Sequence, residues 1–351
     1  MGVETHICVS HPDGLLTPMR RKYASLHRSM KIKRLVIENF KSIERIELIE
    51  PNPFAVFVGP NGSGKSNIFE ALEFVNRCVK VSPNEAVREF GGIANIQNRN
   101  GADLAQFLFG VSFNDNEDEV KFAYDKLIDS IRKDNTFVVA KAPSSGYEQF
   151  YLHFSRVFVG NNKVPKFNYQ DDRSLNFSAS NLEKVLKRVL TNPILRDEIF
   201  EWLELFVPGF KAVEIDDRDE LHWFEDSTPE YFTKELISDG TYNILALLTA
   251  VYQSDDKPQF LCIEEPENGL HPQVAGELVD FFRIMCEERG HYIWLNTHSQ
   301  SMASRVRPEE FVVVEKKQGA TTVRQFEEGD FHGMRADEAW LTNALNGGLA
   351  W

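Results

Sequence analysis

The feature that most restricts the possible folds of this chain is one short segment, PFAVFVGPNGSGKSN, at residues 53–67. Its apolar, β-branched and aromatic start predicts a buried strand, and the spacing of apolar residues after it predicts a helix. Between them, Gly59 to Ser66 form the G-x-x-x-x-G-K-S pattern of a P-loop, whose amides cradle nucleotide phosphates. Because strand, loop and helix occur together, a chance match is a poor explanation.

The residue types in this loop indicate what each can do. Lys65 is expected to reach the β- and γ-phosphates, and the hydroxyl of Ser66 is expected to bind Mg²⁺. The backbone N–H groups at the start of the following helix also favour an anion. The expected nucleotide-binding residues of the loop are Asn61, Gly62, Ser63, Gly64, Lys65, Ser66 and Asn67.

A second segment, PQFLCIEEPENGLHP at residues 258–272, ends an apolar run with two adjacent carboxylates. Acids at the end of a buried strand are costly unless a cation or a reaction needs them. After a P-loop, we expect Glu264 to lie on the metal side and Glu265 to orient the attacking water as general base. A solvated acidic turn is the alternative for the pair. For Glu267, the alternative is a charge at the start of the next helix.

Two more motifs decide which kind of P-loop protein this sequence describes. ISDGT at 237–241 precedes an apolar helix, and NTHS at 296–299 follows a buried strand. Taken alone, Ser238 could be only a helix N-cap, and His298 only a satisfied histidine at a strand end. In the order P-loop, ISDGT, EEPENGLHP, NTHS, however, the chain resembles the ABC-type ATPases of the SMC, RecF and OLD group.

The resemblance implies a shared nucleotide site. In that family each ATP is held between the P-loop of one subunit and the signature loop of another, which implies a homodimer or a higher even oligomer that ATP and Mg²⁺ close. Ser238 and Gly240 would then contact the γ-phosphate across the interface, and His298 would sense it within its own chain. The implied catalytic residues are Glu265, Lys65 and His298.

The sequence departs from the commoner family pattern at three places. Glu264 stands where aspartate is usual, so the charge is kept on a longer arm. Asp239 replaces a glycine in the signature, a variant that the OLD-like branch tolerates. The glutamine of the Q-loop could be Gln97 or Gln106.

The expected fold class is α/β: a P-loop NTPase of ABC type with a mixed central sheet, an antiparallel β lobe and a helical insertion, without a long coiled coil. QFLFGVSF, EVKFAYDKL, TFVVAKA and QFYLHFSRVFVG are expected as strands of the antiparallel lobe, and a later segment as two helices interrupted at Asn192 and Pro193. The expected parts are an N-terminal extension (1–29), the first part of the ATPase head (30–99), the lobe with its insertion (100–235), the second part of the head (236–320) and a C-terminal tail (321–351).

A further acidic cluster, EIDDRDELHW, raises the question of nuclease chemistry. Its acids, Glu214, Asp216, Asp217 and Asp219, could hold two metals, but a hairpin turn is the preferred interpretation. The stretch after the last expected strand, EEFVVVEKK, is too short for the Toprim nuclease domain of OLD nucleases. A separate effector subunit, a nuclease or toxin, is therefore expected. The tail residues Trp340 and Trp351 are expected to dock on the head or to contact a partner.

Composition limits the partners and the compartment. The net charge of −14 excludes a global basic field, so nucleic-acid contact is expected only through a local patch or through a partner. The four cysteines are far apart, which favours a reducing compartment, the cytoplasm. No apolar stretch reaches the roughly 18 residues of a membrane span.

Together, these observations predict an ATP-binding and hydrolysing switch that dimerises on ATP and scaffolds or controls a separate effector. The resemblance extends to stand-alone OLD-like ATPases of bacterial anti-phage systems such as Septu and PARIS, which implies a role in defence. One alternative is a RecF-like DNA-binding repair ATPase. Another is a nucleotide-binding scaffold with little turnover.

Overall fold

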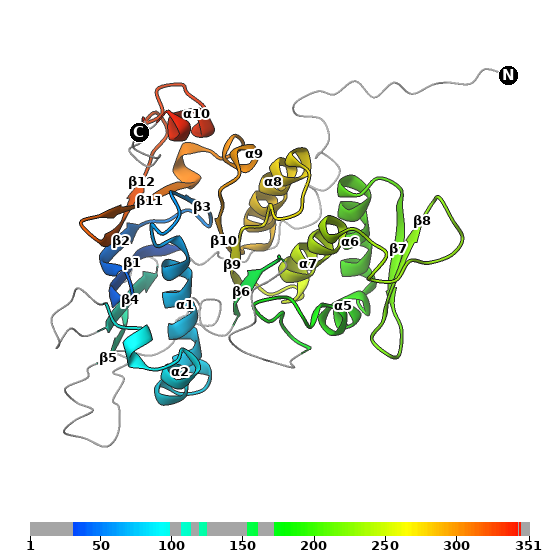
Figure 1. The fold of residues 1–351 in the computed structure, drawn as a ribbon, viewed down its shortest axis with the longest axis horizontal. Coiled ribbons are helices and arrows are strands. Elements are labelled where there is room, and N and C mark those ends of the chain that lie inside the picture. Colours follow the sequence, from blue (N-terminus) through cyan, green and yellow to red (C-terminus); the bar gives the residue numbers. More distant parts are fainter. Residues whose placement is uncertain are drawn as a thin grey trace.

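The structure is a computed structural model, and it describes residues 31–98, 107–113, 119–124, 153–160, 172–342 and 344. Figure 1 shows an antiparallel sheet on one side of the molecule, a group of helices with a two-stranded hairpin on the other, and the strands of a second sheet between them. The expected extension 1–29 lies outside the described residues. No helix within these ranges is long and apolar enough to cross a membrane.

A central sheet of six strands, counted within the described ranges, carries the nucleotide motifs. In spatial order the strands are β12 (Ala320–Gln325), β11 (Phe311–Lys317), β3 (Phe54–Val58), β10 (Tyr292–Asn296), β9 (Phe260–Glu264) and β6 (Phe154–Phe158). β12 pairs antiparallel with β11, and the other pairs are parallel. β3, β6, β9 and β10 are buried at every position, as expected for a parallel sheet covered on both faces.

A second, antiparallel sheet covers one face of the central sheet. Its strands, in spatial order, are β2 (Ile43–Ile49), β1 (Ile32–Phe40), β4 (Phe107–Phe113) and β5 (Glu119–Tyr124). The P-loop helix α1 (Lys65–Lys80) shares a core with both sheets. In it, Phe74 packs edge-on against Phe107 with ring centroids 5.4 Å apart. A short helix α2 (Pro83–Glu89) and a 3₁₀ turn η2 (Ile93–Asn95) follow.

Helices cover the opposite face of the central sheet. They are α5 (Leu182–Leu190), α6 (Pro193–Phe206), α7 (Asp239–Tyr252) and α8 (Pro272–Arg289), and a hairpin of β7 (Phe210–Ile215) and β8 (Leu221–Glu225) extends from them. α7 is buried at every position from Ile244 to Tyr252, because it packs against α5 and α6 and belongs to the same core as the sheet. At the contact of α6 with α8, Trp202 lies 4.7 Å from Phe281 between ring centroids.

The C-terminal part returns to the head. α9 (Gln300–Ala303), η4 (Pro308–Glu310) and α10 (Ala336–Leu341) complete the described elements. Trp340 is buried against the core, whereas Leu341 remains 54% exposed. For Trp340 the structure therefore shows docking on the chain's own head. Trp351 lies outside the described residues.

The expected fold class is confirmed, with two differences in strand placement. QFYLHFSRVFVG was expected in the antiparallel lobe, but its strand β6 pairs parallel with β9 at the edge of the central sheet. Its side chains are buried on both faces, which suits a covered parallel sheet better than a half-exposed one. The second difference is β12, a strand beyond the last one expected, whose polar sequence ATTVRQ lacks the apolar signal of a core strand. TFVVAKA lies outside the described residues.

Candidate functional site

The P-loop connects β3 to α1 in a conformation that needs glycine. Gly64 has φ 105°, and a Cβ there would collide with the hydroxyl of Thr321. At Gly59 a Cβ would collide with the carbonyl oxygen of Val314 on β11. Asn61 and Gly62 form the exposed tip of the loop, and Ser63 is buried. Neighbouring atoms therefore leave no room for a side chain at Gly59 or Gly64, whereas the tip of the loop is exposed.

Lys65 lies at the first position of α1 with a buried ammonium group. Its Nζ donates to the carbonyl oxygens of Gly59, at 2.8 Å, and Pro60, at 3.2 Å. Burial lowers the pKa of Lys65 to about 8, although Glu265, Glu267 and Glu264 act in the opposite direction. A phosphate is a stronger partner for this cation than two loop carbonyls, so the site favours an anion.

Ser66 and Glu264 meet although they come from different strand–helix units. The Ser66 hydroxyl donates to Oε2 of Glu264 at 2.8 Å, and Nδ2 of Asn296 donates to the same hydroxyl at 3.4 Å. Asn296 is the parallel partner of Glu264 in the sheet, so β9 and β10 deliver both side chains to one edge. A hydroxyl and a carboxylate are hard oxygen ligands of the kind that Mg²⁺ prefers. These residues fit a magnesium ion.

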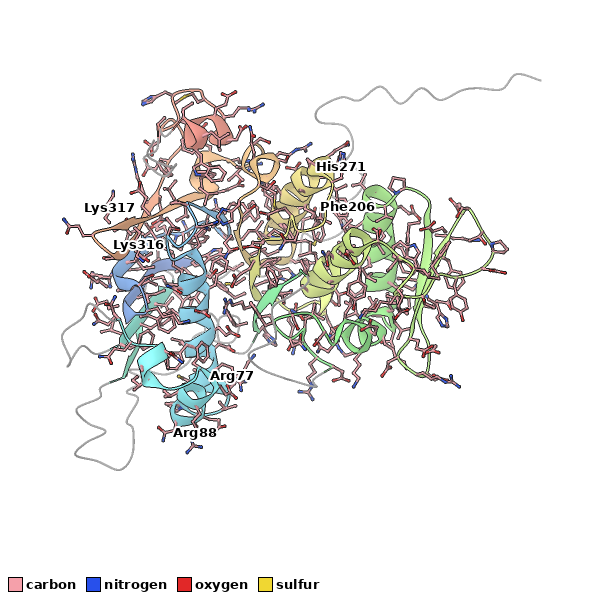
Figure 2. All side chains as sticks on the ribbon, in the orientation of Figure 1. Arg77, Arg88, Phe206, His271, Lys316 and Lys317 are labelled. Carbon is pink, nitrogen blue, oxygen red and sulfur yellow. The ribbon has the colours of Figure 1, made fainter. Side chains whose placement is uncertain are left out.

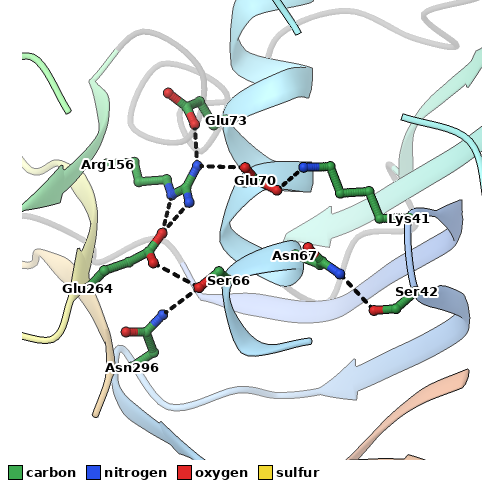
Figure 3. A network of polar contacts seen from close by, with 9 residues as sticks. All are labelled: Lys41, Ser42, Ser66, Asn67, Glu70, Glu73, Arg156, Glu264 and Asn296. Carbon is green, nitrogen blue, oxygen red and sulfur yellow. Dashed lines mark hydrogen bonds and ion pairs between the residues drawn. The ribbon is translucent and has the colours of Figure 1, made fainter. Parts of the chain in front are cut away.

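An arginine that the sequence analysis did not identify completes this edge. Arg156 of β6 donates from Nε to Oε1 of Glu264 at 2.6 Å, and from Nη1 to Glu73 at 2.7 Å. Its Nη1 also lies 3.7 Å from Glu70, which pairs with Lys41. Figure 3 shows the network between α1, β6 and β9. The only sequence signal was a charged residue inside an otherwise buried run, SRVF.

Glu265 follows directly in an unusual backbone conformation. Its φ is 48°, in the left-handed region that non-glycine residues seldom adopt. The backbone N–H donates to the carbonyl oxygen of Asn296 at 2.9 Å, and Nδ2 of Asn268 donates to the carboxylate at 3.2 Å. Asn296, at the end of β10, therefore fixes the backbone of this acid, and Asn268, in the loop after β9, holds its side chain.

A hydrogen bond joins Glu267, in the loop after β9, to His298, which follows β10. The backbone N–H of His298 donates to Oε1 of Glu267 at 2.9 Å, and burial raises the pKa of Glu267. The alternative role of Glu267 as a helix N-terminal charge is wrong, because α8 begins at Pro272 and is capped by His271. Burial lowers the pKa of His298, and the charge of Lys65 adds to this, while Glu265 opposes it. The pKa of His298 therefore responds to the charges of both Lys65 and Glu265.

The ISDGT segment lies at the start of α7. Ser238 is the N-cap, and its hydroxyl accepts the N–H of Thr241 at 3.0 Å, so the N-cap interpretation is confirmed for this residue. A Cβ at Gly240 would lie 2.5 Å from the carbonyl oxygen of Gly269. Through this contact the segment packs on the loop after β9, while Ser238 and Asp239 remain exposed.

The remaining candidates lie apart from this site or outside the described residues. Asn67 is directed to the turn between β1 and β2, where its Nδ2 donates to Ser42 at 2.7 Å. Gln97 forms an isolated bridge with Phe40 at the antiparallel sheet, and Gln106 lies outside the described residues.

The acidic segment EIDDRDELHW connects β7 to β8, so the expected hairpin turn is confirmed. Asp216 accepts the backbone N–H groups of Arg218 and Glu220, both at 2.8 Å. The potential ligand atoms of Asp216, Glu220 and His222 lie within 4.8 Å of one another; Glu220 is exposed, and the other two residues are half-buried. The turn explains the position of Asp216, whose carboxylate accepts its hydrogen bonds.

Comparison with known proteins places the chain among ATPases. Residues 54–302 match a family described as "AAA domain, putative AbiEii toxin, Type IV TA system". Over 121 residues, 34% of this chain and 9% of the relative, it is 30% identical to the chromosome partition protein Smc of Methanocaldococcus jannaschii. Over 166 residues, 47% of this chain and 12% of the relative, it is 27% identical to the protein of the same name from Methanococcus voltae. The match thus spans a small part of these relatives.

Solved structures show the same fold. A crystal structure of an Smc head bound to the C-winged helix domain of ScpA has a TM-score of 0.59 and 16% identity, and covers 84% of this chain and 97% of that one. An Smc head with an extended coiled coil, bound to the C-terminal domain of ScpA derived from Pyrococcus furiosus, has a TM-score of 0.57 and 15% identity, and covers 90% of this chain and 99% of that one. At this identity the likeness concerns the fold.

Proposed function

The chain belongs to this AAA-domain family and is an ABC-type ATPase domain with an SMC-head fold, and on that basis we propose that it binds and hydrolyses ATP with Mg²⁺ as a molecular switch. The observation that carries the proposal is the hydrogen bond between Ser66 and Glu264, because it brings the P-loop and the acidic strand end to one edge of the sheet. Carboxyl ends of parallel strands are where ligands bind in open α/β sheets.

In the proposed mechanism each residue of the edge has a distinct task. The ammonium group of Lys65 would leave its loop carbonyls and pair with the phosphates, which the backbone amides of the P-loop would also contact. Ser66 and Glu264 would hold Mg²⁺, which would neutralise charge on the phosphates. Glu265 accepts the proton of the attacking water, and Asn268 and Asn296 hold it in place for that step.

His298 serves as the sensor of the γ-phosphate. Its lowered pKa favours the neutral imidazole, which can donate one hydrogen bond without adding a charge next to Lys65. Its backbone is tied to Glu267, so a movement of the imidazole is transmitted to the loop after β9. The same loop packs on Gly240 of the signature segment.

We propose that the active form is a homodimer or a higher even oligomer. The N-terminus of α7 presents the exposed Ser238 next to the half-buried Gly240, an arrangement suited to a phosphate held by a partner subunit. The two Smc heads described above are bound to a second protein, which supports control of a separate protein by this head. The family description, "putative AbiEii toxin, Type IV TA system", agrees with a bacterial toxin–antitoxin setting. The proposed role in anti-phage defence rests on the resemblance to stand-alone OLD-like ATPases.

A DNA-associated role is the second candidate, because the relatives are chromosome partition proteins. The net charge of −14 favours contact through a partner over contact by this chain itself.

The test is native mass spectrometry of the purified chain and of its Glu265→Gln variant, with ATP and Mg²⁺ or with EDTA. We expect the variant to form a nucleotide-bound dimer only with ATP and Mg²⁺, because binding persists while hydrolysis is blocked. Co-purification of a neighbouring gene product supports effector control, whereas retained DNA supports the second candidate. A chain that stays monomeric in every condition contradicts the proposed switch.

A further inference from the structure

Arg156 lies where the central sheet meets the P-loop helix. Its side chain is 4% exposed, and its guanidinium stands 4.6 Å from the ring centroid of Phe177. Oxygen atoms from three carboxylates surround it: Glu264 at 2.6 Å, Glu73 at 2.7 Å and Glu70 at 3.7 Å. An arginine held on so many sides has little freedom to move.

The charges of this group are closely balanced. Three carboxylates face two cations, Arg156 and Lys41, so the group carries one negative charge beside Ser66. Burial by itself lowers the pKa of Arg156, but Glu264, Glu73 and Glu70 together raise it above its ordinary value. Because a buried, unpaired carboxylate is costly, removal of the guanidinium must disturb all three acids.

The two oxygens of Glu264 have different partners. Arg156 holds Oε1, and the hydroxyl of Ser66 is bound to Oε2. Glutamate has one more rotatable bond than the aspartate usual at this position, so its carboxylate needs an external restraint to stay in one orientation. A planar guanidinium with several donors supplies such a restraint through directed hydrogen bonds.

We propose that Arg156 is a positioning residue for Mg²⁺ binding: it fixes one oxygen of Glu264 and thereby directs the other to Ser66, where the metal is bound. The inference rests on the proposed function, because it requires ATP and Mg²⁺ at the P-loop. The proposal also explains why position 264 is a glutamate: one carboxylate contacts both Arg156 and Ser66. It also predicts that Arg156 affects metal-dependent binding and leaves metal-free binding unchanged.

The experiment compares Arg156→Gln with a matched control, Arg77→Gln, in the full chain. Arg77, labelled in Figure 2, lies on the same helix as Glu70 and Glu73 and forms a two-bond pair with Glu89. It is in the last turn of α1, whereas Ser66 is in the first. The measurement is the dissociation constant of ATP by calorimetry, once in EDTA and once with Mg²⁺. The quantity of interest is the factor by which Mg²⁺ tightens binding, because a purely structural role of Arg156 changes both constants alike.

For Arg156→Gln we expect this factor to fall about tenfold or more, as outer-sphere partners of metal ligands commonly show, while the constant in EDTA stays within about twofold of the parent. Arg77→Gln is expected to keep the parent factor. An unchanged or larger factor in Arg156→Gln overturns the inference. If Arg156→Gln fails to fold, Arg156→Lys decides, because it keeps the charge but loses the planar fork. A reduced factor in Arg156→Lys supports positioning, and an unchanged factor overturns it.

A second pair of variants separates this inference from the proposed function. Glu264→Asp shortens the arm, so it is expected to lose part of the Mg²⁺ effect, and adding Arg156→Gln to it is expected to cause little further loss. Additive losses overturn a role that acts through Glu264. If the parent chain itself binds ATP equally with and without Mg²⁺, or binds none, the proposed function fails. If instead Mg²⁺ tightens ATP binding equally in the parent and in Arg156→Gln, the proposed function stands and only the role of Arg156 fails.

Discussion

The Ser66 hydroxyl and Oε2 of Glu264 lie 2.8 Å apart, although 198 residues separate them in the chain. The contact exists because β3 and β9 flank the same strand, β10, and end at the same edge of the sheet. Whatever binds at this edge must engage both halves of the head at once. Nucleotide occupancy can therefore be transmitted between the P-loop helix and the loop that carries Glu265.

Substitution of Glu265 by glutamine should separate binding from hydrolysis. The amide keeps the shape of the side chain but cannot accept the proton of water, so we expect kcat to fall about 100-fold or more. ATP affinity should remain close to that of the parent. Phosphate release and calorimetry measure the two quantities. Glu287→Gln, at an exposed position of α8, is the control, and an equal loss in both variants would exclude the assigned role.

ATP affinity should decrease as the pH rises above about 8. Burial lowers the pKa of Lys65 to about 8 in the free chain, whereas a bound phosphate favours the charged ammonium and raises it. Above pH 8 the free chain must therefore take up a proton to bind, and affinity should fall by at most about tenfold per pH unit. Fluorescent ATP titrations between pH 7 and about 9.5 measure this. In Lys65→Arg the guanidinium stays charged, so a similar slope in that variant would contradict the assignment.

Ser238→Ala should weaken both α7 and the proposed dimer. Loss of the hydroxyl that accepts the Thr241 N–H should cost about 0.5–2 kcal/mol of stability. Ser82→Ala is a matched control, because Ser82 caps α2 through the N–H of Glu85. Thermal melts should show similar small losses for both variants. ATP-dependent dimerisation, followed by light scattering, should fail only for Ser238→Ala. If Ser82→Ala also fails to dimerise, the effect of Ser238→Ala comes from lost stability alone.

Thr321→Val should loosen the P-loop. The buried hydroxyl of Thr321 donates to the carbonyl oxygen of Ser63 at 2.8 Å and lies 2.6 Å from the hydroxyl of Ser42. Leaving these groups unpaired should cost about 1–3 kcal/mol and weaken ATP binding. Thr249→Val is the control, because its equally buried hydroxyl donates within α7, to the carbonyl oxygen of Leu245. If the two variants bind ATP equally well, Thr321 has no part in shaping the loop.

Much of the fold could be predicted because its signals are local. The apolar runs before Gly59 and after Pro258 indicated buried strands, and both are strands of the central sheet. The interruption at Asn192 and Pro193 indicated two helices, and α6 begins at Pro193 with Asn192 as its cap.

The contacts of Arg156 and Thr321 could not be predicted in the same way. The position of Arg156 depends on β6 joining the edge of the central sheet beside β9, a pairing between segments more than 100 residues apart. Thr321, on β12, contacts the P-loop because β12 pairs with β11, which lies beside β3. Such long-range order is set by the packing of the whole sheet, and no short pattern in the sequence reports it.

The position of β3 between β10 and β11 also orders the events of biosynthesis. When the P-loop leaves the ribosome, neither neighbouring strand has been made, and the threonine that braces the loop follows 258 residues after Ser63. We therefore expect a nascent chain to hold nucleotide only after translation has passed Thr321. ATP would then bind to the assembled sheet, too late to guide the early collapse of the segment that carries its binding motif.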